Sequence, residues 1–176
     1  MLQPAPGHLL VASPLLEDPN FERSVVLIGD HGPDGTFGVI LNRPLDIDTD
    51  DDFPAWTPLL SPPATLFGGG PVSTETILGL ASGTAGDSPI GGDLTLVGLA
   101  DPAPLEVSQV RLFAGHAGWG SGQLDGELAQ EAWFVVHRAP GDVFTSEPAL
   151  LWRDVLRRQP GDLQLVSFYP RDLSSN

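Results

Sequence analysis

The chain has 176 residues, and its 8 Lys+Arg against 23 Asp+Glu give a formal net charge of −15. It contains no cysteine, which excludes a disulfide scaffold, a thiolate zinc site and a cysteine nucleophile. Domains typically hold roughly 100–200 residues, so the length predicts a single compact domain over residues 1–176 that needs neither disulfide nor metal to hold its core.

We expect no targeting signal in the N-terminal segment. Its apolar run from Leu9 to Leu16 has no basic region before it and is interrupted at Ser13-Pro14. A membrane span needs ~20 consecutive apolar residues, far more than this run supplies. We therefore expect a soluble, cytoplasmic protein with no membrane partner.

Short apolar runs separated by Gly and Pro predict a sheet-rich fold. Most of them are continuously apolar rather than alternating, which is typical of strands covered on both faces. Strands are expected at residues 9–12, 24–29, 36–41, 65–67, 76–80, 94–97, 110–113 and 132–136. The second and third are separated by residues 30–35, where Asp34-Gly35 favours a tight hairpin turn.

Two stretches lack strand periodicity. Residues 43–63 combine five aspartates with five prolines, and we expect an irregular segment with one helical turn. Residues 83–92 are expected to form a loop.

Two helices are expected in the second half of the chain. Residues 123–130 follow a glycine-rich turn at 114–122, and residues 147–158 show the best amphipathic pattern. Ser146 is a candidate cap for the second helix, whose C-terminal arginines suit the helix dipole. Residues 163–169 are expected to be a last strand or an apolar tail. Because strands outnumber helices, the fold class is mixed α/β or α+β.

Three motifs suggest chemistry that their spacing does not support. The acidic run at 46–52 would need glutamate at the twelfth position of an EF-hand loop, where the chain has Thr57. His31 beside Asp30 could hold a weak surface cation, the alternative being a solvated turn. Ser121 lies among glycines but in no G-x-S-x-G motif. We expect no metal site and no cofactor.

Residues 115–122, Gly-His-Ala-Gly-Trp-Gly-Ser-Gly, form the most suggestive segment. A strand, a glycine-rich turn and a helix N-terminus can present backbone N–H groups to an anion. Neither nucleotide fingerprint fits, since Gln123 replaces the last glycine of G-x-G-x-x-G and the chain has no Walker lysine. The alternative is a tight turn that packs Trp119 against neighbouring backbone.

Polar residues nearby could complete such a surface. Gln123 and Glu127 are four residues apart and share one face of the expected helix. Pro44 forces Arg43 into an extended conformation at the end of a strand. We predict that Arg43 pairs with a carboxylate, Glu127 being the best candidate.

Blocks of sequence along most of the chain, in the right order, resemble the YqgE/AlgH family of bacterial proteins. They are Gly7 to Pro14, Asp18 to Val25, His31 to Pro44 with its Gly-Val-Ile-Leu-Asn-Arg-Pro ending, Phe67 to Val72, Gly115 to Glu127, and Leu151-Trp152. The resemblance implies an α/β fold with a mixed, partly barrel-like sheet flanked by helices. The family has no established catalytic residues and no agreed ligand, and it is sometimes labelled a transcriptional regulator.

This chain departs from the family pattern at two places. Asp- and Pro-rich chain after Pro44 replaces a segment that is usually helical, and Gly79 lies where the family commonly has a histidine. No site role is therefore carried over from the family.

Three hypotheses about function follow. The first is a non-catalytic protein that binds a small ligand or a protein partner and has a regulatory role. Its candidate surface comprises Asn42, Arg43, Gly69, Gly70, Gly118, Trp119, Gly120, Gln123 and Glu127. The second is a hydrolase-like enzyme with Glu127 or His116 as general base. The third is a DNA-binding transcriptional regulator. The net charge opposes it, because DNA binding needs clustered cations and the sequence groups only Arg153, Arg157 and Arg158.

Overall fold

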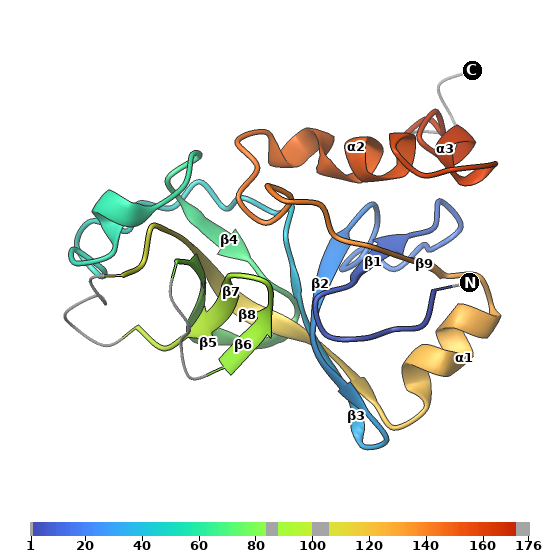
Figure 1. Cartoon of the computed structure of the whole chain (residues 1–176), viewed down its shortest axis with the longest axis horizontal. Coiled ribbons are helices and arrows are strands. Elements are labelled where there is room, and N and C mark those ends of the chain that lie inside the picture. Colours follow the sequence, from blue (N-terminus) through green and yellow to red (C-terminus); the bar gives the residue numbers. More distant parts are fainter. Residues whose placement is uncertain (1, 84–87, 100–105, 172–176) are drawn as a thin grey trace.

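The computed structural model describes residues 2–83, 88–99 and 106–171 (Figure 1). Its strands are β1 (Leu9–Ala12), β2 (Val25–Gly32), β3 (Gly35–Ile40), β4 (Leu66–Gly68), β5 (Val72–Ser82), β6 (Ser88–Gly91), β7 (Leu94–Val97), β8 (Gln109–Gly120) and β9 (Trp133–Val136). Its helices are α1 (Gln123–Ala129), α2 (Leu151–Arg157) and α3 (Leu163–Val166), with 3-10 turns at Thr57–Leu59 and Pro148–Leu150. Among the described residues, no helix has the length and apolar character that crossing a membrane requires.

One long strand, β8, joins two groups of strands into a single sheet. Hydrogen bonding orders the strands β6-β7-β5-β8-β3-β2-β1-β9. The first part of β8 pairs with β5 and, in parallel, with β4, whereas residues 117–120 pair with β3. The sheet is therefore mixed, as expected. Within the described residues its path stays open from β6 to β9, so the sheet is not closed into a barrel.

Helices cover the two faces of the β1–β2 part of the sheet. Side chains alternate along β1, because successive residues of a strand point to opposite faces. Leu9 and Val11 pack in one core cluster with Trp152 of α2, and Leu10 packs in a second cluster with Leu124 of α1. Figure 1 shows α2 and α3 on one side of the sheet and α1 at the other. The expectation of strands covered on both faces is confirmed here.

The Asp- and Pro-rich segment at 43–63 is irregular and has a single 3-10 turn, as predicted. It contributes a third core cluster, in which Trp56, 1% exposed, packs with Val110 and Leu112 of β8. The segment thus covers the β5–β8 part of the sheet.

Arg111 of β8 is enclosed in the core and only 1% exposed. Its two terminal nitrogens donate to four backbone carbonyl oxygens, those of Ser61 (3.3 Å), Pro62 (2.7 Å), Val143 (3.0 Å) and Thr145 (2.8 Å). Its guanidinium carbon lies 4.4 Å from the centre of the Phe67 ring. Burial lowers the pKa of Arg111 to about 10, so the side chain stays protonated at neutral pH. Four carbonyl dipoles stabilise this buried cation, which ties β8 to two loops.

The predicted glycine-rich turn at 114–122 is wrong for most of its length. Strand β8 continues to Gly120, because residues 117–120 pair with β3. Only residues 121–122 form the turn before α1. The backbone of residues 117–120 is therefore paired within the sheet, so the open loop that the anion-site hypothesis assumed does not form.

Three other expectations are corrected. Residues 163–166 form helix α3 rather than a strand, with local bonds such as Leu165 N–H to the Asp162 carbonyl. Residues 88–91 pair with β7 as strand β6 instead of belonging to a loop, while residues 84–87 lie outside the described part. The helix expected at 147–158 is divided into a 3-10 turn and α2. Ser146 does not cap it, because Glu147 precedes the turn and no side chain bonds to its N-terminus.

Replacing Arg111 with methionine tests whether this buried side chain holds β8 to the two loops. Methionine keeps apolar volume but leaves the buried carbonyls of Ser61 and Val143 without this donor. An unsatisfied buried acceptor costs ~1–3 kcal/mol, so we expect Arg111→Met to lower the free energy of unfolding by about 2–5 kcal/mol. Urea denaturation followed by tryptophan fluorescence measures this loss. The exposed Arg157→Met is the control and should stay within about 0.5 kcal/mol of the parent; equal effects would contradict the interpretation.

Candidate functional site

The candidate surface predicted from the sequence divides into two regions. Arg43 and Gly70 line a groove of about 600 Å³ beside β4 and β5. Gly120 lines a separate cavity of about 430 Å³ at the β2–β3 hairpin. Glu127 of α1 bonds to Trp119 near the C-terminal end of β8, whereas β4 pairs with residues 112–114 of the same strand. The structure therefore does not bring these residues to one site.

Asn42 positions the loop that precedes β2. Its side-chain oxygen accepts the Val25 N–H at 3.0 Å, and its amide nitrogen donates to the carbonyl of Arg23 at 2.9 Å. Arg23 has a φ of 52°, a left-handed conformation that costs a non-glycine residue of order 1–3 kcal/mol. Asn42 thus holds Arg23 in an uncommon backbone conformation.

The predicted pairing of Arg43 with Glu127 is wrong. Arg43 donates from Nη2 to the backbone carbonyl of Glu22. Burial is the main cause that lowers the pKa of Arg43; the Glu22 carboxylate opposes this shift and the Arg171 cation adds to it. The chemical type of each side chain was compatible with a pair, but sequence alone does not place the two elements in space.

Glu127 instead joins two tryptophans. Its Oε2 accepts the indole N–H of Trp119 at 2.6 Å and that of Trp133 at 3.1 Å. The two indole rings lie edge to face at 5.8 Å, and Phe21 contacts both. Trp119 is 5% exposed and Trp133 is 2% exposed. The side-chain oxygen of Gln123 accepts the Gly120 N–H at 2.9 Å, which adds a further hydrogen bond between α1 and β8. This group anchors α1 to the sheet.

Two of the four glycines of the predicted surface, Gly69 and Gly70, are required by close packing of backbone. A Cβ on Gly69 would lie 2.2 Å from the Gly115 carbonyl oxygen, and one on Gly70 would lie 2.2 Å from the His116 backbone. Gly70 also has a φ of 150°. Gly118 differs, because the nearest atom to its added Cβ is a methyl group of Val72 at 3.9 Å.

The residues proposed for catalysis do not form a nucleophile and base. His116 is half-buried, with its ring centre 4.9 Å from that of Phe37 and tilted by 41°, and neither it nor Glu127 lines the groove or the hairpin cavity. Ser121 does line the hairpin cavity with His31, but its hydroxyl donates to the Pro33 carbonyl at 2.6 Å. The His31 Nδ1 lies 2.7 Å from the Thr36 hydroxyl oxygen.

A metal site is not formed by the described residues, since none of them gather three or more His, Asp or Glu side chains suitable for an ion. The weak cation site considered at His31 and Asp30 has no such cluster. Asp30 instead accepts the backbone N–H of His31 at 3.0 Å within the hairpin.

The groove is the most apolar of these hollows. Ile40 and Leu66 contribute to its wall, together with Leu45 and Ile47, which are 42% and 47% exposed. Leu45 and Ile47 lie on the segment that bonds to β4 through the N–H of Leu45 and the carbonyl of Ile47. Sequence reasoning missed both residues because each stands alone among aspartates and prolines in a segment without strand or helix periodicity. The available signal was the presence of two apolar residues, Leu45 and Ile47, within an otherwise acidic segment; the left-handed φ of 59° at Asp46 means that strand alternation does not explain their shared face.

Glu127 offers a direct test of the tryptophan anchor. Glu127→Ala leaves two mostly buried indole N–H groups without an acceptor, and an unsatisfied donor costs ~1–3 kcal/mol. We expect a loss of about 2–4 kcal/mol in the free energy of unfolding, measured by urea denaturation. Glu127→Gln keeps an acceptor oxygen and should lose less than half of that. Equal losses, or none, would contradict the anchoring role.

Alanine substitutions at Gly70 and Gly118 distinguish a glycine required by backbone packing from one that has room for a side chain. Gly70→Ala places a Cβ against backbone at a positive φ, so we expect a loss of more than about 2 kcal/mol. Gly118→Ala meets only ordinary contacts and should change stability by less than about 1 kcal/mol. Thermal unfolding of the two variants compares them; a smaller loss for Gly70→Ala than for Gly118→Ala would refute the assignment.

Comparison with known proteins shows the family to which this chain belongs. A family model described as AlgH-like matches residues 9–164. A UPF0301 protein of Streptomyces coelicolor is 49% identical over 182 residues, which cover 97% of this chain and 94% of the relative. One of Thermobifida fusca is 44% identical over 187 residues, with 97% and 94% covered.

Two solved structures share the fold. A crystal structure of a Corynebacterium diphtheriae protein has a TM-score of 0.87 and 38% identity, covering 96% of this chain and 94% of that one. The solution structure of the AlgH protein from Pseudomonas aeruginosa has a TM-score of 0.69 and 25% identity, covering 97% and 98%. The resemblance seen in the sequence is confirmed, and the chain belongs to the AlgH-like family of UPF0301 proteins.

Proposed function

We propose that this protein acts by binding a small ligand with an apolar body in the groove beside β4 and β5, without catalysing a reaction. The observation that carries the proposal is the groove itself, with Leu45 and Ile47 exposed in its wall and Arg43 among its lining residues. A volume of about 600 Å³ is within the range of small-molecule sites, which combine apolar walls with a few polar groups.

A role without catalysis is supported by the side chains proposed as bases. The Oε2 of Glu127 already accepts two indole N–H groups, and the ring of His116 packs against that of Phe37. Using Glu127 as a general base would place a proton on the acceptor that anchors α1. The hydrolase alternative is therefore the weaker proposal.

A regulatory role is proposed through the bound ligand or a protein partner rather than through direct contact with DNA. The net charge of −15 repels a polyanion at long range. Of the arginines clustered in sequence, Arg158 forms an ion pair with Asp142, with Nη2 and Oδ2 2.5 Å apart. That pairing leaves fewer free cations for phosphate contacts at this helix.

A neutral fluorescent probe, N-phenyl-1-naphthylamine, tests the groove. We expect saturable fluorescence enhancement with the full chain. Loss of ~1.5 kcal/mol of apolar burial corresponds to about tenfold in affinity, so Leu45→Ser and Ile47→Ser should each weaken binding by about this factor. Leu150→Ser is the matched control, because Leu150 is also 42% exposed but lies outside the groove.

Unchanged melting temperatures of the variants without probe show that the fold is kept. Absence of saturable binding to the parent protein, or equal weakening by Leu150→Ser and Leu45→Ser, would overturn the proposal.

A further inference from the structure

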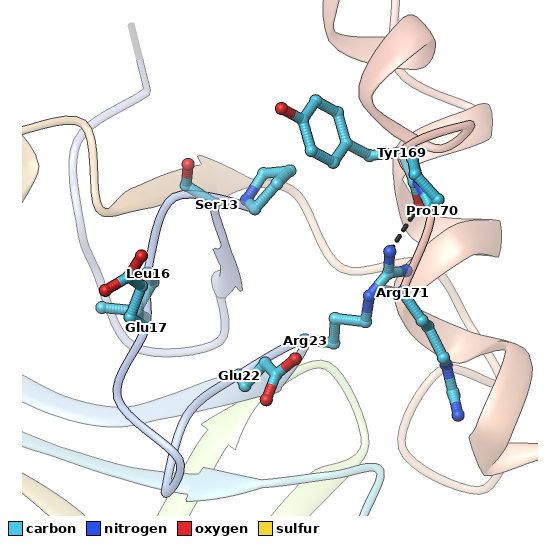
Figure 2. Close-up of a pocket in the computed structure, with 9 residues that line it drawn as sticks. Ser13, Leu16, Glu17, Glu22, Arg23, Tyr169, Pro170 and Arg171 are labelled. Atoms are coloured by element: carbon cyan, nitrogen blue, oxygen red, sulfur yellow. Dashed lines mark hydrogen bonds between the residues drawn. The ribbon is translucent and has the colours of Figure 1, made fainter. Parts of the chain in front are cut away.

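A further hollow, also lined by Arg43, lies between the loop before β2 and the C-terminal segment. It has a volume of about 200 Å³ and is lined by Glu22, Arg23, Asn42, Arg43, Ala149 and Arg171. A neighbouring hollow of about 240 Å³ shares Glu22, Arg23 and Arg171 with it and adds Pro14, Leu16 and Tyr169 among its walls. Figure 2 shows this neighbour, with Arg23 reaching from the loop toward Tyr169 and Pro170, and Arg171 beside them.

The charge of this hollow is opposite to that of the molecule. The chain has 8 cations and 23 carboxylates, yet the wall of the smaller hollow holds three arginines and one glutamate. Three positive charges less one negative charge leave a local charge of +2. No carboxylate oxygen of the described residues lies within 4.0 Å of a guanidinium nitrogen of these three arginines. Among the described residues these three cations therefore have no direct ion pair, while the Glu22 carboxylate lies near enough to raise the pKa of Arg23 and of Arg43.

Two of the three guanidinium groups are held in place by neutral partners. Arg23 lies over the Trp152 ring at 4.3 Å and donates to the Tyr169 carbonyl at 2.5 Å. Arg43 donates to the Glu22 carbonyl. A guanidinium has five N–H donors, and each of these bonds uses one nitrogen, so further donors remain for a ligand. The left-handed φ of Arg23 adds local strain that the Asn42 bonds maintain.

The arginines also repel one another. Burial is the largest cause that lowers the pKa of Arg23, followed by the cations Arg171 and Arg153, while Glu22 opposes the shift. The pKa of Arg43 is lowered by burial first and by Arg171 as well. A bound anion would relieve this repulsion, since an opposite charge favours the charged form of each guanidinium.

We propose that Arg23, Arg43 and Arg171 form a binding site for the phosphate group of a small phosphate monoester. A phosphate dianion matches the local charge of +2, and its oxygens accept the forked N–H donors of arginine. The smaller hollow receives the phosphate, and the neighbouring hollow beside Leu16 and Tyr169 receives the organic part of the ester. This inference does not depend on the proposed groove ligand.

Calorimetric titration of the full chain at low ionic strength tests the site. The probes are inorganic phosphate, phenyl phosphate and, as a monoanion of similar size, benzoate. We expect saturable binding of both phosphates, tighter for phenyl phosphate, and at least about tenfold weaker binding of benzoate. A control titration with chloride at the same ionic strength measures the effect of salt screening alone.

Charge-matched variants locate the binding. Arg171→Gln and Arg43→Gln should each weaken phenyl phosphate binding by at least about tenfold. Arg157→Gln removes the same charge from an exposed position on α2 outside both hollows and should change affinity by less than about twofold. Arg171 makes no hydrogen bond within the described residues, so Arg171→Gln keeps the test valid even if Arg43→Gln fails to fold.

Two results would overturn the proposal. One is the absence of saturable phosphate binding by the parent protein. The other is an equal loss of affinity in Arg157→Gln and Arg171→Gln, because it would indicate long-range attraction only. Benzoate binding as tightly as phenyl phosphate would overturn the assignment to a dianion. Arg171→Gln should leave the naphthylamine probe unaffected because Arg171 does not line the groove, so failure of this proposal and failure of the groove proposal are distinguishable.

Discussion

Strand β8 must pair with strands in both halves of the sheet, and this constraint explains much of the surrounding sequence. Its first part pairs with β4 and β5, its last part pairs with β3, and the change between them occurs near Gly115, which has a φ of 75°. The chain at Gly69 and Gly70 lies directly against this point, with no room for a Cβ. Arg111 then fixes the buried end of the same strand to two loops. The glycines and the buried cation are thus parts of one solution to a crowded junction.

Local structure could largely be predicted because its causes are local. Strands β1 and β7 have the predicted bounds, and the hairpin between β2 and β3 and the irregular segment at 43–63 were recognised from turn residues, Asp and Pro. The segment before α1 was misassigned because glycine has two uses. It permits a turn, but it also permits backbone to approach backbone within a sheet, and only the partner strand β3 decides between them.

The candidate site could be predicted only in part, because it depends on contacts between distant segments. Arg43 and Gly70 do line the groove, but Glu127 is engaged by tryptophans on β8 and β9. The sequence grouped Arg153 with its helical neighbours, whereas the fold gathers cations from three segments around the smaller hollow. A count of charges along the chain cannot reveal such a group, since each of its arginines is isolated in sequence.

Arg43 is the point at which the two proposed binding regions meet, because it lines both the apolar groove and the smaller arginine-rich hollow. Its guanidinium is half-buried and bonded to Glu22, so its freedom to serve both regions is limited. A ligand that orders this side chain on one side changes the donors available on the other. Coupling of this kind is reciprocal by thermodynamic linkage. With both proposed sites occupied, this single side chain would make the affinity for one ligand depend on the presence of the other.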